Sequence, residues 1–489
     1  MSTFDQAAAA RVRAAAEQAI EEHHLPGIAI GVVEGGDLVF AEGFGHADIE
    51  SRAPQDPARR QRIASITKTM TGLCLMALVD ERRLSLDDLV VRHLPEVHFH
   101  GPADTMTLRH LLTHTSGMGE APTDAALAAS VGPNTDGGAP AGDFSVHYPD
   151  GIVVEARPGE KWAYCNNGYA LLGEIIVRTE GAALHDVFQR RIFGPLGMTD
   201  SDCLDQPHHR LTTGYHRAPD ADTRELFERA GIEVKDEATV DGHNIRGAFA
   251  PEPNTGDYAA GAVQSTVPDM ARYAAALLDR SGGIVRPETF DAMTAPQCCP
   301  DERLVSWGLA FARATRFGHR TFGHGGAFFG GWNSNLTAIP DLGVAVIQHM
   351  NVMLSSPAPV FNRVLRAVLD VTEPAASHAP IDDGLLDAAP GVYECTPGRL
   401  TNFRPATRYG RIHIERDGDA LLLRSRRGPW KEGVRMERAD AADPSLFLVA
   451  VPNADPARVV LTLDAADRPD GLRFDDLVHM VRGRDAEAS

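Results

Sequence analysis

A serine and a lysine three residues apart are the side chains of this sequence best suited to nucleophilic chemistry. Ser65 and Lys68 lie in the run Arg-Ile-Ala-Ser-Ile-Thr-Lys at 62–68, at the start of a long apolar stretch. On a helix, residues i and i+3 share a face, so the lysine amine can reach the serine hydroxyl. The chain has four lysines among its 47 lysine and arginine residues. A lysine can lose its proton and act as a base, whereas an arginine stays protonated. The pair therefore indicates an activated nucleophile.

The same pair also has a purely structural interpretation, in which Ser65 caps a helix and Lys68 is a solvated residue of its first turn. Two later signatures favour catalysis. A Tyr-Cys-Asn run at 164–166 precedes a helical pattern, and a His-Gly-Gly run at 324–326 lies in a strand-like segment. Each signature alone could belong to a core tyrosine, a helix cap or a strand histidine. Together and in this order they indicate one site.

In these three motifs the sequence resembles the serine β-lactamase and penicillin-binding protein superfamily. The resemblance is to its class C-like branch of D-aminopeptidases, D-alanyl-D-alanine carboxypeptidases and carboxylesterases. That family carries Ser-x-x-Lys, then Tyr-x-Asn, then Lys-Thr-Gly or His-x-Gly. Stretches at 84–88, 108–117, 195–198 and 260–266 are also typical of the branch, so the resemblance covers roughly residues 20 to 350. It implies an α+β fold, with an antiparallel sheet flanked by helices and a helical subdomain.

The resemblance implies a catalytic role for five side chains. Ser65 would attack a carbonyl carbon to form an acyl-enzyme, Lys68 would assist removal of the serine proton, and Tyr164 would relay protons to and from the leaving group. Asn166 would hydrogen-bond the lysine or the substrate amide. His324 stands where many relatives have lysine, so positive charge at this place would depend on pH.

Backbone groups complete the implied site. The N–H groups of Ser65 and Ala327 would form the oxyanion hole. Gly325 and Gly326 would let the substrate backbone lie close to their strand. No serine lies in a Gly-x-Ser-x-Gly run, which excludes the α/β-hydrolase elbow.

Periodicity predicts the elements that must position these residues. A helix is expected at 6–24, a β-hairpin at 27–41 with its turn at 34–37, and a mostly buried helix at 65–81. Antiparallel strands are expected at 306–311, 321–326, 332–339 and 343–348, followed by a helix at about 359–370. A sheet assembled from both ends of this segment would result. The Gly/Pro/Asp-rich stretch 119–152 is predicted to be a long loop.

The chain of 489 residues is long enough for more than one domain. We predict a serine hydrolase domain at 1–375, a Pro/Ala/Ser-rich linker at 376–385, and a small antiparallel β-barrel at 386–489. Regularly spaced short strands indicate the barrel, which resembles the lipocalin-like domains appended to some relatives of the family.

Composition restricts the partners and the compartment. The net charge of −20 argues against nucleic acids and anionic membranes as partners. The N-terminus lacks a basic region before an apolar core, and six cysteines show no framework spacing, so a reducing cytoplasm is expected. His98 with His100, and His208 with His209, are not joined by further ligands, so neither a metal nor a cofactor is expected.

The sequence therefore predicts a serine hydrolase that cleaves amide bonds of small peptides or amides, including D-amino-acid compounds, through an acyl-enzyme on Ser65. The histidine form of the third motif favours the D-peptidases over the esterases. A carboxylesterase, a β-lactamase and a non-catalytic binding protein that retains the fold stay open as alternatives. The expected substrate is a small molecule or short peptide, and self-association into a homo-oligomer is also left open.

Overall fold

The computed structural model describes residues 4–119, 151–204, 210–217, 237–240, 243–246, 258–328, 331–354, 357–371, 379–394, 409–426, 428–451, 454–466, 468–474 and 479–483. The loop predicted at 119–152 lies almost entirely outside these residues, as do His208 and His209. None of the helices within the described ranges combines the length and the apolar character needed to cross a bilayer.

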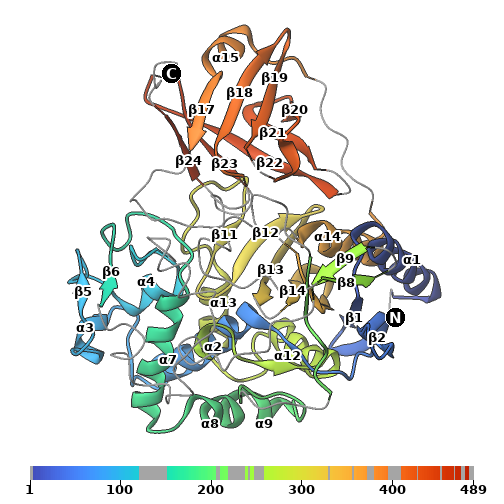
Figure 1. Cartoon of the computed structure of the whole chain (residues 1–489). Coiled ribbons are helices and arrows are strands. Elements are labelled where there is room, and N and C mark those ends of the chain that lie inside the picture. Colours follow the sequence, from blue (N-terminus) through green and yellow to red (C-terminus); the bar gives the residue numbers. More distant parts are fainter. Residues whose placement is uncertain are drawn as a thin grey trace. The chain divides into compact units, whose positions relative to one another are not determined.

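The chain packs as two compact units. Unit 1 comprises Met1–Cys298 and Trp307–Asp370, and unit 2 comprises Cys299–Ser306 and Val371–Ser489. In Figure 1 the strands of unit 2 that follow residue 390 are orange to red. The segment Cys299–Ser306 belongs to unit 2 although the residues on both sides of it belong to unit 1.

An eight-stranded sheet forms the centre of unit 1. Its strands are β1 (Gly27–Glu34), β2 (Asp37–Asp48), β3 (Ala53–Pro54), β11 (Ser306–Trp307), β12 (Ala312–Arg316), β13 (His319–Phe328), β14 (Trp332–Ile339) and β15 (Val344–Met350). Their order in the sheet is β11-β12-β13-β14-β15-β1-β2-β3. Because β1 pairs antiparallel with both β2 and β15, the sheet joins the two ends of the unit, as the sequence predicts.

The hairpin between β1 and β2 has a turn that only glycine adopts easily. Gly35 and Gly36 have φ angles of 60° and 92°, and Glu34 pairs with Asp37 across the turn. Positive φ at both central positions is typical of the turns that match strand twist in two-residue hairpins.

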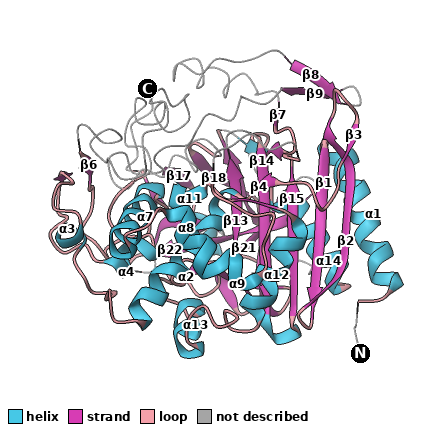
Figure 2. Ribbon diagram, turned by 90° about the horizontal axis from the view of Figure 1, so that it is seen from below, coloured by secondary structure: helices cyan, strands magenta, loops and turns pink. Residues whose placement is uncertain are grey.

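Helices cover both faces of this sheet (Figure 2). One face packs against α1 (Gln6–His23) and α14 (Ala358–Leu369). The other face shares one hydrophobic core with α2 (Thr67–Asp80), α4 (Leu108–Leu112), α7 (Asn166–Glu180), α8 (Leu184–Phe188), α12 (Val267–Leu278) and α13 (Pro287–Thr294). Shorter helical segments are η1 (Ala64–Ile66), α3 (Val90–His93), η2 (Gln189–Phe193), α9 (Gly194–Leu196), α11 (Tyr258–Gly261) and η3 (Pro340–Leu342).

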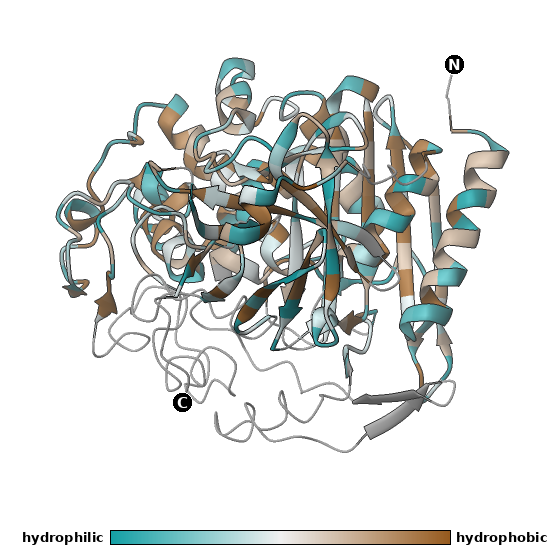
Figure 3. Cartoon of the chain, turned by 90° about the horizontal axis from the view of Figure 1, so that it is seen from above, coloured by the Kyte–Doolittle hydropathy of each residue, from teal (hydrophilic) through white to brown (hydrophobic). Residues whose placement is uncertain are grey.

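Strand β1 shows how the two cores share one sheet. Ile28, Ile30 and Val32 belong to the core under α1 and α14. Ala29 and Val33 belong to the core that contains α2. Alternate side chains of a strand point to opposite faces, so a continuous apolar run indicates burial on both sides. The strands nearest the N-terminal helix are accordingly mostly brown in Figure 3.

Three small sheets complete unit 1. One pairs β4 (Gln61–Arg62) with β10 (Gln264–Ser265), and a second pairs β5 (Phe99–His100) with β6 (Ile152–Val153). The third has four strands: β7 (Tyr215–Arg217), β8 (Glu237–Val240), β9 (His243–Arg246) and β16 (Val352–Met353). The first of them matters for the site, because β4 leads directly into η1.

Unit 2 is a closed eight-stranded antiparallel barrel, as the sequence predicts. Its strands are β17 (Gly391–Glu394), β18 (Ile412–Asp417), β19 (Ala420–Ser425), β20 (Val434–Asp440), β21 (Asp443–Val451), β22 (Ala454–Leu463), β23 (Pro469–Phe474) and β24 (His479–Arg482). Stacked rings of Tyr409, Trp430 and Phe474 fill part of its core. A short helix, α15 (Asp383–Ala388), precedes β17 and begins inside the segment expected to be linker; η4 (Gly428–Trp430) follows β19.

The segment Cys299–Ser306 is fixed within unit 2 by charge and by apolar packing. The Arg303 guanidinium pairs with Asp301 at 2.6 Å and with Asp443 at 2.8 Å. Leu304 packs with Leu446 and Val460 in a small buried cluster. Sequence periodicity gave no indication that these residues leave unit 1.

Candidate active site

Ser65 lies in a short turn whose backbone is under strain. The turn is η1, and α2 begins two residues after the serine. Ala64, just before Ser65, has a φ of 47°, a left-handed conformation that residues other than glycine seldom adopt. Such strain persists only where the surroundings enforce it, and it often marks functional sites.

The residue before this turn is held from two sides. The Ile63 N–H donates to the Val263 carbonyl at 3.0 Å, and the Ser334 hydroxyl donates to the Ile63 carbonyl at 2.7 Å. Val263 lies just before β10, and Ser334 lies on β14. The position of the nucleophile is therefore set by the central sheet and by the β4–β10 pair together.

Lys68 contacts Ser65 as the spacing predicts. Its Nζ lies 3.1 Å from Ser65 Oγ and donates to the Ala260 carbonyl at 2.8 Å. The lysine is fully buried, at 0% exposure, and lies over the rings of Tyr164 and Tyr169 at 5.0 and 5.5 Å from their centres. Among the residues that the structure describes, no carboxylate forms an ion pair with this amine, so its polar partners are the serine hydroxyl and one carbonyl.

Tyr164 is buried and enclosed by other rings. The His114 imidazole stacks on the phenol with ring centres 4.3 Å apart and an angle of 28°. His114 Nδ1 also accepts the Cys165 N–H at 3.1 Å, and its carbonyl accepts the Ala163 N–H at 2.8 Å. One histidine thus binds the backbone on both sides of Tyr164 and covers its ring.

His324 reaches the same cluster from β13. It is 6% exposed, and its ring centre lies 6.1 Å from that of Tyr164 and 5.4 Å from that of Trp307. Its Nδ1 contacts the Gly325 carbonyl at 2.5 Å. A carbonyl can only accept, so Nδ1 is the donor in this contact, and Nε2 is an acceptor when the ring is neutral and a donor when it is protonated.

The glycines of the third motif differ in their surroundings. A Cβ on Gly326 would lie 2.2 Å from both the Ile63 carbonyl oxygen and Ser334 Oγ, whereas a Cβ on Gly325 would meet nothing within less than 4.0 Å. Gly326 therefore allows β13 to pack against the segment that carries Ser65. Gly325 and Ala327 are exposed on the other side of the strand.

Asn166 is the first residue of α7, two residues after Tyr164. It is partly buried. The structure therefore places the serine, the lysine, the tyrosine and the histidine of the three motifs in one cluster.

Sequence reasoning missed three contributors to this cluster. His114 looks like the end of a helix followed by a glycine turn, and it has a left-handed φ of 57°. Trp307 contacts the rings of His114, Tyr164 and His324. The Ala260 carbonyl holds the lysine. His114 and Ala260 lie in stretches already recognised as typical of the branch, whereas nothing in the sequence distinguishes Trp307.

Burial controls the charge of the second tyrosine under the lysine. Tyr169 is fully buried, and this burial raises its pKa well above the usual value. Its hydroxyl donates to the Leu112 carbonyl at 2.9 Å. Tyr169 therefore stays neutral and supports α4, which precedes His114.

Within the described residues, no group of three or more His, Cys, Asp or Glu side chains is arranged to hold a metal ion.

Comparison with known proteins places this site in a family. A sequence model of the β-lactamase family matches residues 12–370. The chain belongs to the β-lactamase family. This match includes Ser65, Lys68, Tyr164 and His324, and it ends at the last residue of unit 1.

This β-lactamase-family chain is similar to two curated proteins, and the match covers a different share of each. Protein flp of Staphylococcus aureus (strain NCTC 8325 / PS 47) is 32% identical over 185 residues, which are 37% of this chain and 36% of flp. The chain thus matches about a third of the length of flp. Esterase EstB of Burkholderia gladioli is 29% identical over 320 residues, which are 63% of this chain and 79% of EstB.

Solved structures share the fold. The octameric penicillin-binding protein homologue from Pyrococcus abyssi has a TM-score of 0.62 and 22% identity, and the match covers 97% of this chain and all of that one. The D-amino acid amidase from Ochrobactrum anthropi SV3, in complex with D-phenylalanine, has a TM-score of 0.60 and 25% identity. That match covers 74% of this chain and 99% of the amidase.

Proposed function

We propose that the protein is a serine hydrolase that cleaves amide bonds of small peptides or amides, including D-amino-acid compounds, through an acyl-enzyme on Ser65. The observation that carries this proposal is the 3.1 Å contact between the fully buried Lys68 Nζ and the partly buried Ser65 Oγ. A buried amine beside a hydroxyl, with no carboxylate partner among the described residues, is suited to accept the serine proton as Ser65 attacks.

The residues of the site account for each proton in the two half-reactions. Ser65 Oγ bonds to the carbonyl carbon, and its proton passes to Lys68 and on through Tyr164 to the leaving nitrogen. The carbon–nitrogen bond then breaks and leaves an acyl-enzyme. In the second half, water loses a proton to the same groups and attacks the ester, and Ser65 regains its proton. The N–H groups of Ser65 and Ala327 are the proposed oxyanion hole.

Amide cleavage depends on a proton donor more strongly than ester cleavage does, because an amine leaves only after it is protonated. Tyr164 lies over the lysine amine, at 5.0 Å from ring centre to Nζ, and beside His324. Asn166 and His324 are further polar groups proposed to bind the substrate amide or a substrate carboxylate. The similarity to a D-amino acid amidase supports the D-amino-acid class.

The second candidate function is that of a carboxylesterase, which the similarity to esterase EstB favours. β-Lactamase activity and a non-catalytic binding role are less favoured alternatives. The pairing of Ser65 with Lys68 argues against a role without catalysis. We also propose a cytoplasmic location, which the free thiols of Cys74 and Cys203 support. A homo-oligomer is a further proposal, to be tested by light scattering.

Labelling with a fluorophosphonate tests the nucleophile. Intact mass spectrometry should show one adduct on the wild type and none on Ser65→Ala. Ser51→Ala is a matched control that should still be labelled, since Ser51 is exposed and its hydroxyl donates to Asp48 at 2.6 Å. Equal labelling of Ser65→Ala would eliminate Ser65 as the nucleophile.

A substrate screen distinguishes the two candidate functions. D- and L-aminoacyl amides should be compared with p-nitrophenyl esters at equal enzyme concentration. We expect kcat/KM to be highest for a D-aminoacyl amide. If esters are hydrolysed and every amide is left intact, the amidase proposal fails while the acyl-enzyme on Ser65 stands.

A further inference from the structure

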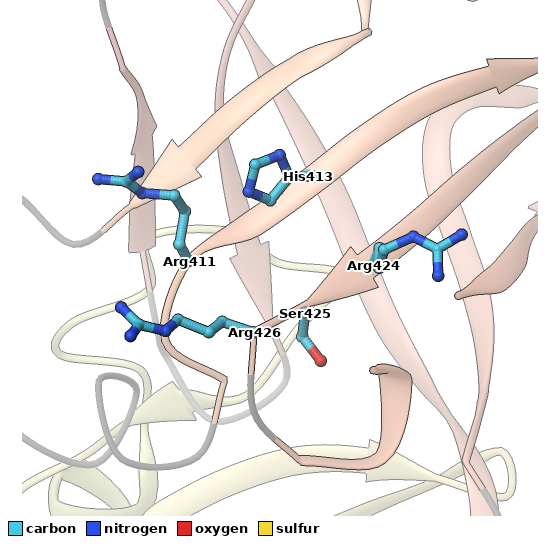
Figure 4. A pocket seen from close by; sticks show the side chains of 5 residues that line it. All are labelled: Arg411, His413, Arg424, Ser425 and Arg426. Atoms are coloured by element: carbon cyan, nitrogen blue, oxygen red, sulfur yellow. The ribbon is translucent and has the colours of Figure 1, made fainter. Parts of the chain in front are cut away.

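The barrel of unit 2 has a pocket lined by cationic side chains. Its volume is about 390 Å³, and the lining residues are Arg411, His413, Arg424, Ser425 and Arg426 (Figure 4). We propose that this pocket binds a small ligand through a carboxylate or phosphate group. The inference goes beyond the proposed hydrolase activity, because none of the motif residues lies in unit 2.

Two neighbouring strands hold the basic side chains in fixed register. His413 on β18 is paired with Arg424 on β19, and Ile412 is paired with Ser425. The ladder continues one step further, where the Arg426 N–H donates to the Arg411 carbonyl at 2.9 Å. The pocket therefore rests on paired backbone and not on a free loop.

This register brings like charges together. Side chains directly opposite each other on antiparallel strands are close neighbours, and like charges there are destabilising. Arg411 lies opposite Arg426, and Figure 4 shows both side chains extending to the same side. An anion bound between these two guanidinium groups would offset their repulsion.

Elsewhere in unit 2, three exposed arginines are matched by acids, whereas Arg438 and Arg482 donate to backbone carbonyls. Arg416 pairs with Asp383 and Asp387, Arg435 with Asp419, and Arg468 with Asp464. These pairs account for exposed arginines as ordinary surface charge in a chain whose net charge is −20. The pocket differs because three arginines, Arg411, Arg424 and Arg426, line one cavity.

One carboxylate is paired with one of the three guanidinium groups that line the pocket. Arg411 pairs with Glu394 at 2.9 Å. Arg424 donates to the Lys431 carbonyl at 3.3 Å. Among the described residues, Arg426 has no acceptor for its guanidinium, and its side chain is exposed. Two guanidinium groups without a matching carboxylate therefore line the same cavity.

Guanidinium groups determine the chemical class of the ligand. Their planar set of N–H donors matches the oxygens of a carboxylate or phosphate, with which they form paired, charge-assisted hydrogen bonds. A cavity of about 390 Å³ has room for a small organic acid or a phosphorylated metabolite. Both ligand sources share this oxyanion chemistry, and the two arms of the test distinguish them.

Calorimetric titration of the full-length protein tests the proposal. Inorganic phosphate and succinate are added separately to the wild type, to Arg426→Gln and to Arg435→Gln. Arg435 is a matched control because it is an exposed barrel arginine that is already paired with Asp419. We expect saturable binding of at least one anion, weakened about tenfold or more in Arg426→Gln and unchanged in Arg435→Gln, a tenfold change being about 1.4 kcal/mol.

A second variant works in the opposite direction. Glu394→Gln removes the carboxylate that competes for Arg411, so it should bind the anion more tightly than the wild type. Binding of phosphate alone would identify a phosphate-bearing ligand, and binding of succinate alone would identify a carboxylate. No saturable binding of either anion, or equal weakening in Arg426→Gln and Arg435→Gln, would overturn the proposal. Labelling of Ser65 by a fluorophosphonate should be unchanged throughout, so failure here does not affect the proposed hydrolase function.

Discussion

The His114 imidazole lies face to face with the Tyr164 phenol, with ring centres 4.3 Å apart. The same histidine accepts the N–H of Cys165 through Nδ1 and the N–H of Ala163 through its carbonyl. Three contacts from one residue thus fix the short segment in which Tyr164 lies. His114 is a positioning residue in the proposed mechanism, because it acts through the tyrosine and has no assigned contact with the substrate.

Replacement of His114 should therefore lower turnover more than it lowers stability. His114→Leu keeps an apolar surface beside Tyr164 but loses the acceptor for Cys165, so we expect kcat to fall about tenfold or more while KM changes little. His110→Leu is the control on the same segment, since His110 Nδ1 accepts the Thr107 N–H at 3.1 Å in a capping box. That control should lose about 1 kcal/mol of stability and keep its turnover. Equal kcat values for the two variants would contradict the positioning role.

Lys68→Arg tests whether the buried amine is a base. The substitution keeps positive charge beside Ser65 but introduces a group that cannot lose its proton, so turnover should fall on the order of a hundredfold or more. Circular dichroism and thermal melting establish whether the variant is folded. Turnover close to that of the wild type in a folded Lys68→Arg would remove the lysine from the mechanism.

The two tyrosines beside Lys68 provide a matched pair. Both rings lie within 5.5 Å of Nζ, but only Tyr164 is assigned to proton transfer. Tyr164→Phe should lose about a hundredfold or more in kcat. Tyr169→Phe should keep most of its activity and lose about 1 kcal/mol of stability, because the Leu112 carbonyl loses its donor. Steady-state kinetics and urea denaturation of both variants measure this difference, and the reverse pattern would assign the relay to Tyr169.

The third motif makes a prediction about packing. Gly326→Ala would place a methyl group 2.2 Å from the Ile63 carbonyl oxygen, so β13 and the turn before Ser65 must separate. We expect a loss of about 1–3 kcal/mol in stability and slower acylation of Ser65. Gly325→Ala has open space around its new methyl group and should be as stable as the wild type. Equal melting temperatures for the two variants would show that β13 need not lie this close to the turn.

The burial of His349 predicts how the free energy of unfolding depends on pH. Complete burial on β15 lowers its pKa to about 4, whereas in the unfolded chain it is about 6.5. Above pH 6.5 the histidine is neutral in both states and has no pH-dependent effect. Between pH 6.5 and 4 the unfolded chain binds a proton that the folded protein does not, so stability falls as pH falls.

A comparison of two pH values measures this effect. Between pH 7.5 and 5.0 the wild type should lose about 2 kcal/mol more of its unfolding free energy than His349→Leu, which has no titrating group there. Urea denaturation at both pH values gives the two differences. If the variant loses as much as the wild type, a different group is responsible for the acid sensitivity.

Much of the fold could be predicted because the sequence repeats a simple physical pattern. The continuous apolar run of β1 and the glycine pair at 35–36 specify a buried strand and its turn, and both are present. The regular short strands after residue 390 predicted the barrel, and the structure confirms it. The three motifs could be found because each is a local run of residues with unusual chemistry.

The missed residues lack such a local pattern. Trp307 contributes through ring contacts with His114 and Tyr164, which lie more than a hundred positions away in sequence, and with His324, which is nearer. No period or spacing in the sequence identifies such contacts. Ala260 acts through its backbone carbonyl, which every residue has. Gly326 is predicted to make room for a substrate, and the structure adds a second reason for a glycine there, the close approach of the Ile63 carbonyl. Only the folded chain distinguishes these two reasons for a glycine.

Because Cys299–Ser306 belongs to unit 2, the barrel cannot be moved from one protein to another by gene fusion as a single continuous segment. The chain passes between the units at 298/299, at 306/307 and again at 370/371. A gene fusion cut at the last passage alone would transfer the barrel without Arg303 and Leu304, and it would leave Asp443, Leu446 and Val460 without the partners that they have here. Shuffling by a single crossover is therefore disfavoured, because the barrel and this eight-residue segment must be inherited together.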